Sequence, residues 1–209
     1  MGILRSGIFG GFEKKTGRLV GRRLKDKSVI SGTPHKSTKA RSQAQLEQQL
    51  KLELVISFLV KFSNLIAVGF RKVRGKGNAF NTAVKHNFKH IVTGIAPNFT
   101  IDYTRMVYSV GSLAGPNQPE LSLMDDVVQI RWLPDVQMQF SQNTDKASFT
   151  VYCPDKDFVI TKIGTALRSA LSYHMVLPSG LSEGRLHCFM NFVSADGKWV
   201  SNSTYLGTI

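Results

Sequence analysis

The sequence has few cysteines, no long apolar run and almost no acidic side chains near its start. Among 209 residues only Cys153 and Cys188 are cysteines, and neither belongs to a Cys-x-x-Cys pair. This excludes a zinc ribbon and a disulfide-rich secreted scaffold. We expect two reduced, buried thiols, with pairing across two sheets as the alternative.

The longest apolar stretch, residues 54–60, is interrupted by Ser57 and is much shorter than the roughly 20 residues of a membrane-spanning helix. A secretory signal needs about 7 to 15 apolar residues after a basic start. Residues 1–11 contain only short apolar pieces broken by Arg5, Ser6 and glycines. We therefore expect no membrane span, no Sec signal peptide, and a location in the cytoplasm or in a virion or similar particle.

Positive charge is concentrated at one end of the chain. Lys and Arg total 27 against 14 Asp and Glu, a formal net charge of +13. Residues 1–76 hold 17 of the basic and four of the acidic side chains, whereas residues 77–209 hold ten of each sign. This asymmetry predicts that the first part meets a polyanion, either nucleic acid, an anionic membrane or the acidic face of a neighbouring subunit.

Residues 1–41 are rich in glycine and basic side chains, and no helical or strand period persists in them. We predict an extended basic arm that docks on a partner through the apolar residues Ile3, Leu4, Ile8, Phe9 and Phe12. Residues 70–77 form a second basic segment, in which Phe70 could stack on bases, as could Phe9 and Phe12. The predicted polyanion-binding residues are Lys14, Lys15, Arg18, Arg22, Arg23, Lys25, Lys27, Arg71, Lys72, Arg74 and Lys76.

A helical hairpin is predicted over residues 42–96. Ser42 and Gln45 form a capping box and Gly69 a left-handed stop, so the first helix covers about residues 43–68. The second begins at the cap Asn78 and runs to about residue 92. An apolar stripe on the first helix packs on the protein's own core or on another subunit. The residues of this predicted assembly helix are Leu46, Leu50, Leu54, Phe58, Phe62 and Ile66.

From residue 97 onward the apolar period changes to two. The Asp196-Gly197 pair suits a tight turn, so the last two apolar runs should form a hairpin. Six or seven short strands, with Trp132 on an early one, predict an immunoglobulin- or fibronectin-like antiparallel β-sandwich over residues 97–209, with a small barrel as the alternative. The fold class is therefore α+β. The runs cover residues 101–109, 127–132, 148–153, 172–177, 186–194 and 199–206.

Residues with catalytic or ligand-binding chemistry do not form a recognisable set. Five residues separate Gly69 from Gly75 and no Ser or Thr follows Lys76, so the basic segment is not a phosphate-binding loop. His86 and His90 have the spacing of two metal ligands on a helix but lack a third. We predict no catalytic residues, no metal site, no cofactor and no small-molecule substrate.

Short segments spread over the chain form a recognisable set. They are residues 2–12 (GILRSGIFGGF), Lys15-Thr16-Gly17, Val20-Gly21, residues 37–51, Asn78-Ala79-Phe80, residues 97–103 (PNFTIDY) and residues 192–198 (FVSADGK). Together they resemble a widespread uncharacterised family of Bacteroidota proteins with a basic, glycine-rich N-terminus. The resemblance implies a bacterial or phage context and a C-terminal β-sandwich, and brings no known activity. The N-terminus is also similar to those of some phage-encoded proteins, which favours a structural role.

We therefore expect a non-enzymatic structural or assembly subunit, such as a component of a phage virion, a virus-like particle or a filament, that forms homo-oligomers. Its basic region would pack against neighbouring subunits or bind nucleic acid without reading sequence. The alternative is a monomeric immunoglobulin-like module that recognises a protein or carbohydrate, with the basic arm as its anchor. An enzyme would require a deep cleft that joins His174 or His187 to several Asp residues.

Overall fold

The computed structural model describes residues 3–4, 11–24, 27–34, 39–73, 78–134 and 141–209. The chain divides into two compact units, Met1–Ser42 and Gln43–Ile209. Strands predominate over helices among the described residues, and the named strands pair antiparallel, which confirms a β-rich α+β fold. The predicted helical and strand-rich segments both lie in the second unit.

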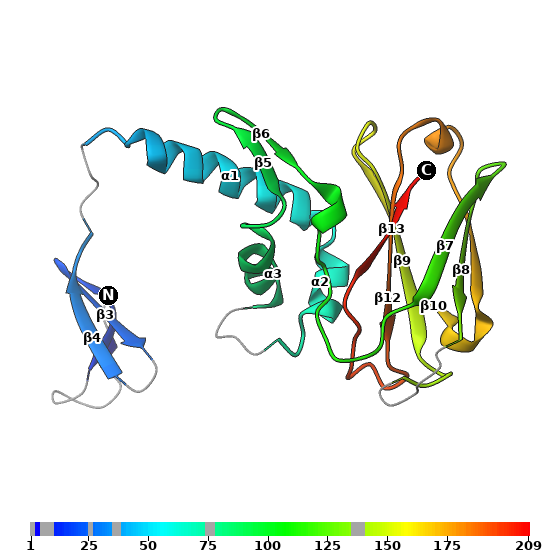
Figure 1. Cartoon of the computed structure of the whole chain (residues 1–209). Helices are drawn as coiled ribbons and strands as arrows, with labels where there is room; N and C mark the ends of the chain where they lie inside the picture. Colours follow the sequence, from blue (N-terminus) through cyan, green and yellow to red (C-terminus); the bar gives the residue numbers. More distant parts are fainter. Residues whose placement is uncertain (1–2, 5–10, 25–26, 35–38, 74–77, 135–140) are drawn as a thin grey trace. The chain divides into compact units, whose positions relative to one another are not determined.

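The first unit is a small antiparallel sheet, where the sequence predicted an extended arm without strands (Figure 1). Gly17, whose φ is +59°, and Arg18 form the two-residue turn between its second and third strands. The sequence of these strands shows no alternation of apolar and polar residues, because most of their side chains are exposed and neither face of the sheet has to be apolar. The strands, neighbours in chain order, are β1 (Ile3–Leu4), β2 (Phe12–Thr16), β3 (Leu19–Leu24) and β4 (Lys27–Gly32).

Seven strands of the second unit form two antiparallel sheets that pack face to face (Figure 1). The four-stranded sheet has the order β10-β9-β12-β13, and the three-stranded sheet has the order β11-β8-β7. Both contribute to one buried core, in which Phe149 of one sheet stacks on Tyr173 of the other at 4.4 Å. The strands are β7 (Asn117–Met124), β8 (Val127–Leu133), β9 (Lys146–Cys153), β10 (Phe158–Leu167), β11 (Ser172–Val176), β12 (His187–Val193) and β13 (Thr204–Thr208).

The sequence located β8, β9, β11 and β12, and the pairing of β12 with β13 confirms the predicted hairpin. It missed β7, which contains Pro119, and β10, where the register shifts between Lys162 and Ala166 around Gly164, whose φ is +63°. Proline and a bulged glycine both weaken a strand signal. The predicted run 199–206 starts too early, because β13 begins only at Thr204.

The four-stranded sheet is covered on its second face by the helical segment. Phe58 and Phe62 from the helices share a buried cluster with Tyr152 of β9 and Phe189 of β12. Residues 147–153 and the whole of β12 are consequently buried at consecutive positions, not alternate ones. The second unit thus has three layers, with the four-stranded sheet in the middle.

The single helix predicted over residues 43–68 is in fact two helices, α1 (Gln43–Val60) and α2 (Ser63–Gly69), bent by 87° at the break. A residue at every fourth position moves by about 40° around a straight helix, so the stripe from Leu46 to Ile66 would turn through about 200°. The bend between α1 and α2 brings the second half of the stripe, Phe62 and Ile66, back to the core. Among the described residues, no single helix is long and apolar enough to span a membrane, and only the bent pair together has the required length and composition.

Gly69 ends α2, but it does not have the predicted left-handed conformation. A Cβ at this position would lie 2.3 Å from the Tyr108 carbonyl oxygen and 2.6 Å from Ser109 Cα. The Gly69 carbonyl accepts a hydrogen bond from the Val110 amide at 3.1 Å. Glycine is therefore required for the close approach of two backbone segments.

The second predicted helix is shorter than expected. α3 (Ala79–Asn87) begins at the predicted cap, where Asn78 Oδ1 accepts from the Asn81 amide at 2.8 Å. It ends where the buried Asn87 side chain donates to the Ala83 and Val107 carbonyls and accepts from the Val107 amide. The predicted strand over residues 101–109 is replaced by a hairpin of β5 (Val92–Ile95) and β6 (Asn98–Ile101), followed by the short helix η1 (Tyr103–Arg105).

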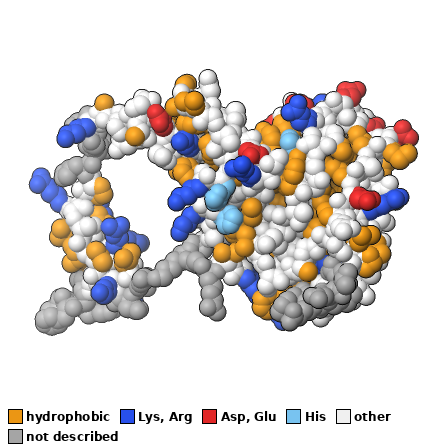
Figure 2. Space-filling view, viewed as in Figure 1, with side chains coloured by type: hydrophobic (Ala, Val, Ile, Leu, Met, Phe, Trp, Pro, Cys, Tyr) orange, Lys and Arg blue, Asp and Glu red, His pale blue; other side chains and the backbone are white. Residues whose placement is uncertain are grey.

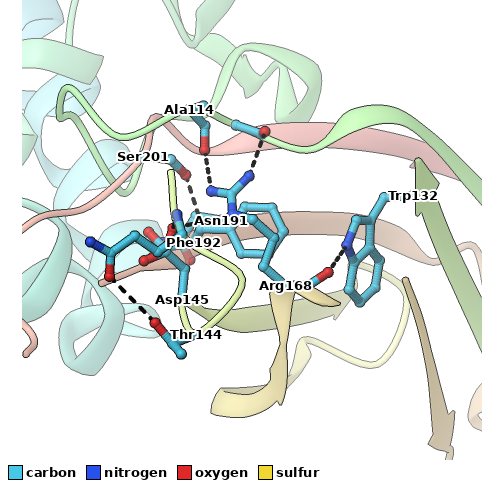
Figure 3. Close-up of polar contacts among 10 residues, drawn as sticks. Ala114, Trp132, Thr144, Asp145, Arg168, Asn191, Phe192 and Ser201 are labelled. Carbon is cyan, nitrogen blue, oxygen red and sulfur yellow. Dashed lines mark hydrogen bonds and ion pairs between the residues drawn. The ribbon is translucent and has the colours of Figure 1, made fainter. Parts of the chain in front are cut away.

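A buried ion pair lies at one end of the two packed sheets (Figure 3). Arg168 Nε lies 3.2 Å from Asp145 Oδ2, and the two side chains are 5% and 1% exposed. The guanidinium donates to the Ala114 carbonyl at 2.7 Å and to the Gly115 carbonyl at 3.4 Å. The Arg168 carbonyl in turn accepts from Trp132 Nε1 at 2.9 Å. The pair thereby connects β8, the turn before β9 and the segment before β7.

Candidate polyanion-binding site

The predicted polyanion-binding residues fall in two places. In the second unit, Arg71 and Lys72 directly follow α2, and both are exposed. Lys25, Arg74 and Lys76 lie outside the described residues. The remaining predicted residues are exposed on the sheet of the first unit and are Lys14, Lys15, Arg18, Arg22, Arg23 and Lys27.

Basic side chains project from both faces of the first unit's sheet. Arg22 and Arg23 are consecutive in β3 and pair with Val29 and Ser28, so their side chains point to opposite faces. Figure 2 shows Lys and Arg side chains over this unit, whereas most of the visible Asp and Glu side chains lie over the second unit. Such a surface attracts a polyanion by charge and does not require base-specific contacts.

In the second unit, Arg71 and Lys72 meet residues that are distant in the sequence. Lys72 Nζ lies 3.5 Å from the ring centroid of Trp199, and Arg71 Nη1 donates to the Gly197 carbonyl at 3.5 Å. Trp199 is still 51% exposed, so much of its indole is open to solvent. We call Arg71, Lys72, Lys198 and Trp199 the Trp199 cluster.

Two shallow grooves meet at the Trp199 cluster, and Val68 and Arg71 line both of them. The first, of about 290 Å³, includes Lys72, Lys198 and Trp199 in its lining. The second, of about 300 Å³, passes Lys146 and the Gly197 turn. Among the described residues that line the two grooves, four are basic and none is acidic. The grooves therefore suit an anionic ligand.

The turn that carries Trp199 is held by hydrogen bonds of its own. The Ser194 amide donates to the Trp199 carbonyl, and the Trp199 amide donates to Ser194 Oγ, both at 2.9 Å. Asp196 Oδ1 accepts from Ser194 Oγ at 2.6 Å and from the Lys198 amide at 3.0 Å. These hydrogen bonds lower the pKa of Asp196 to about 2, and the bond from Ser194 makes the largest contribution. The turn therefore presents Trp199 in a defined position.

Sequence reasoning found half of the Trp199 cluster. It missed Trp199, Lys198 and the neighbouring Lys146, although an aromatic residue two positions after the predicted Asp196-Gly197 turn was an available signal. Its suggestion that Phe70 could stack on bases is wrong, because this side chain is 2% exposed in the core. Phe12 is half-buried, and Phe9 lies outside the described residues.

The predicted assembly stripe is divided between two environments. Phe58, Phe62 and Ile66 are buried in the protein's own core, and Leu54 is half-buried. Leu46 and Leu50 are 41% and 43% exposed. Three further apolar side chains of α1 that do not belong to the predicted stripe are also exposed, namely Leu52, Ile56 and Val60.

Aromatic and ionisable side chains also gather where the helical layer meets the four-stranded sheet. His187 packs on Tyr103, with ring centroids 4.7 Å apart, and its Nδ1 lies 3.0 Å from the Tyr205 hydroxyl. Burial, reinforced by nearby Arg185, lowers the pKa of His187. Lys61 pairs with Asp157, which accepts from the Tyr152 hydroxyl at 3.1 Å.

Among the described residues, neither His174 nor His187 lines the grooves at Trp199. The same residues contain no group of three or more His, Cys, Asp or Glu side chains placed to hold a metal ion. Cys153 and Cys188 are both buried and unpaired with each other.

A family model described as a family of unknown function (DUF6266) matches residues 11–207. The chain therefore belongs to this family, which confirms the predicted membership of an uncharacterised family. The matched range contains the strands of the first unit from β2 onward and the whole Trp199 cluster. No curated protein matches the sequence.

Proposed function

We propose that the protein is a non-enzymatic assembly subunit that binds a polyanion, nucleic acid above all, through its basic N-terminal region. The observation that carries this proposal is the segregation of charge. The net charge of +13 falls within residues 1–76, and every described member of the predicted polyanion-binding set is exposed. Cations that neutralise phosphates release condensed counterions, which favours binding without sequence specificity. A phage virion, a virus-like particle or a filament is a setting that needs such a subunit.

Self-assembly through α1 is supported by its second apolar side. Leu52, Ile56 and Val60 follow one another at four-residue spacing and are 42%, 37% and 52% exposed. Exposed apolar side chains that follow one another along a helix mark a surface that a partner can cover. We propose that the corresponding helix of a second copy covers this side, so that the protein forms homo-oligomers.

For the two packed sheets we propose the immunoglobulin or fibronectin class of sandwich. If the seven strands are lettered A, B, C, C′, E, F and G in chain order, the sheets become A-B-E and C′-C-F-G. This division of the strands between the two sheets supports the proposal. In this lettering Lys198 and Trp199 lie on the F–G loop, at an end of a sandwich where such folds often carry binding loops.

Light scattering after size-exclusion chromatography, combined with the 260/280 nm absorbance ratio and a salt titration of single-stranded DNA binding, tests the proposal. We expect an oligomer and a strong salt dependence. Replacing the six predicted polyanion-binding cations on the first unit's sheet, from Lys14 to Lys27, by Ala should reduce the slope of log K against log salt by about 4, at roughly 0.7 per phosphate contact.

The matched control replaces six exposed cations of the second unit outside the Trp199 cluster, and it should leave the slope almost unchanged. A monomer at every concentration, with and without DNA, would contradict the proposal. The control residues are Lys85, Lys89, Arg105, Lys156, Lys162 and Arg185.

The alternative is a monomeric binding module whose sandwich loops recognise a protein or carbohydrate. The preformed turn at residues 194–199 favours it, because an ordered loop loses little entropy on binding. Deletion of residues 1–41 separates the two functions. A module keeps its ligand and its monomeric state, whereas an assembly subunit loses most of its affinity for a polyanion.

A further inference from the structure

We infer that the Trp199 cluster binds an unpaired base of single-stranded nucleic acid, with the adjoining phosphates on Arg71, Lys72 and Lys198. This inference rests on the proposed polyanion binding and specifies the ligand of one site. It assigns base stacking to the second unit and purely electrostatic contacts to the sheet of the first unit.

The aromatic half of the site is Trp199. Its indole is 51% exposed, although the Lys72 ammonium lies 3.5 Å from the ring centroid. The other tryptophan, Trp132, is 3% exposed in the core of the two sheets. An indole that is fixed by an ordered turn and open to solvent provides a platform on which any base can stack.

The cationic half surrounds this platform. Arg71 Nη1 donates to the Gly197 carbonyl of the Trp199 turn at 3.5 Å. Lys198, which precedes Trp199, forms an exposed ion pair with Asp196 at 3.4 Å, so a phosphate at Lys198 competes with this carboxylate. Lys146 lines the second groove on the other side of Arg71. Because the described lining residues of both grooves include no acidic side chain, a phosphodiester backbone can follow the grooves past the stacked base.

Other ligand classes use only part of this arrangement. An acidic peptide would pair with the cations but would leave the indole without a planar partner. A neutral sugar would stack on the indole but would meet few polar acceptors, since Ser112 and Ser194 are the only uncharged polar side chains among the described lining residues. A DNA duplex offers phosphates, but its bases are stacked inside the helix and out of reach of Trp199. Single-stranded nucleic acid uses both halves.

Fluorescence anisotropy of the full chain with labelled dT12 and with a labelled 12-bp duplex tests the inference. Trp199→Ala should weaken binding of dT12 about tenfold, within the range for loss of one base–aromatic stack, and should change duplex binding by less than about twofold. Trp199→Phe should retain most of the affinity. The matched control is Phe158→Ala, which removes an aromatic ring of similar exposure (46%) from β10. It should bind dT12 as the wild type does.

Intrinsic fluorescence gives a second measurement. Stacking of a base should quench the emission of Trp199 in the wild type. In Trp199→Phe the quenching should disappear while binding persists, because the remaining Trp132 is buried. Unfolding curves of each variant establish that the second unit is intact.

The outcomes separate the two proposals. If Trp199→Ala binds dT12 like the wild type, or loses dT12 and the duplex equally, base stacking at this site is refuted while polyanion binding stands. If the wild type binds neither DNA, the proposed function fails and the inference fails with it. Selective loss of dT12, with quenching that depends on Trp199, supports the inference.

Discussion

Replacement of Arg168 by Met is the sharpest test of how the two sheets are held together. The substitution leaves the Asp145 carboxylate, 1% exposed, with a hydrogen bond from the Gln142 amide at 2.8 Å but without its cationic partner. It also removes the donors to the Ala114 and Gly115 carbonyls and the guanidinium that lies 3.7 Å from the Phe192 ring centroid. The thioether fills part of the space but supplies no donor.

The expected loss follows from burial. Removing one partner of a buried ion pair costs about 3–5 kcal/mol, because the other charge stays buried without compensation. The free energy of unfolding of most domains is about 5–15 kcal/mol, so this loss is a large share of the total. For a urea m-value of about 2 kcal/mol/M, the midpoint should therefore fall by roughly 2 M.

The assay is urea unfolding followed by tryptophan fluorescence in a Trp199→Phe background, where Trp132 is the remaining tryptophan. Trp132 Nε1 donates to the Arg168 carbonyl, so its emission reports on this end of the sheets. Adding Asp145→Asn to Arg168→Met should recover part of the loss, because the uncompensated charge is gone.

The control for this experiment is Arg105→Met. Arg105 Nε lies 3.1 Å from Asp102 Oδ2, but the arginine side chain is 66% exposed, so its replacement should cost no more than about 1 kcal/mol. If Arg168→Met costs as little as this control, the buried pair does not hold the sheets together and the reasoning is refuted.

Three further perturbations have defined outcomes. Gly69→Ala places a Cβ 2.3 Å from the Tyr108 carbonyl oxygen and should destabilise the second unit by about 1–3 kcal/mol, whereas Gly115→Ala meets only a hydroxyl at 3.5 Å and should be tolerated in the same urea assay. Burial lowers the pKa of His187, so below about pH 6.5 the unfolded chain binds more protons than the folded one. Stability should be complete above that pH and decline below it, and a His187→Gln variant with an unchanged pH profile would contradict this assignment. Burial raises the pKa of Cys188 to about 12, and both cysteines are buried, so a thiol reagent should label neither in the native protein and both in denaturant. Rapid labelling without denaturant would show that the packed sheets open.

The fold was predictable where local pattern and burial agree. β8 and β9 carry apolar runs and were located, because their burial in a core demands such residues. The strands of the first unit were missed because exposed sheet faces impose no apolar alternation on the sequence. The break between α1 and α2 was missed because spacing within a helix does not report a bend imposed by a tertiary core.

The candidate site was predictable only in its charged half. Arg71 and Lys72 lie in a run of cations that composition reveals. Trp199 contributes through a contact that spans 127 positions from Lys72, and a single sequence contains no measure of that proximity. The Asp196-Gly197 pair did predict a turn. The sequence does not show that this turn meets Arg71 and Lys72, because that contact depends on the packing of α2 against the Val110 segment.

Two-sided burial of β9 and β12 has a consequence for how this family varies. In a sheet with one solvent face, substitutions accumulate at every second position. Here residues 147–153 and 187–193 have no solvent side, because aromatic side chains from the helices lie on one face and the three-stranded sheet lies on the other. We expect related sequences to resist change at consecutive positions in these two strands, and to diverge freely in the exposed strands of the first unit. A partner therefore cannot reach either face of residues 147–153 or 187–193 without displacing a neighbouring layer.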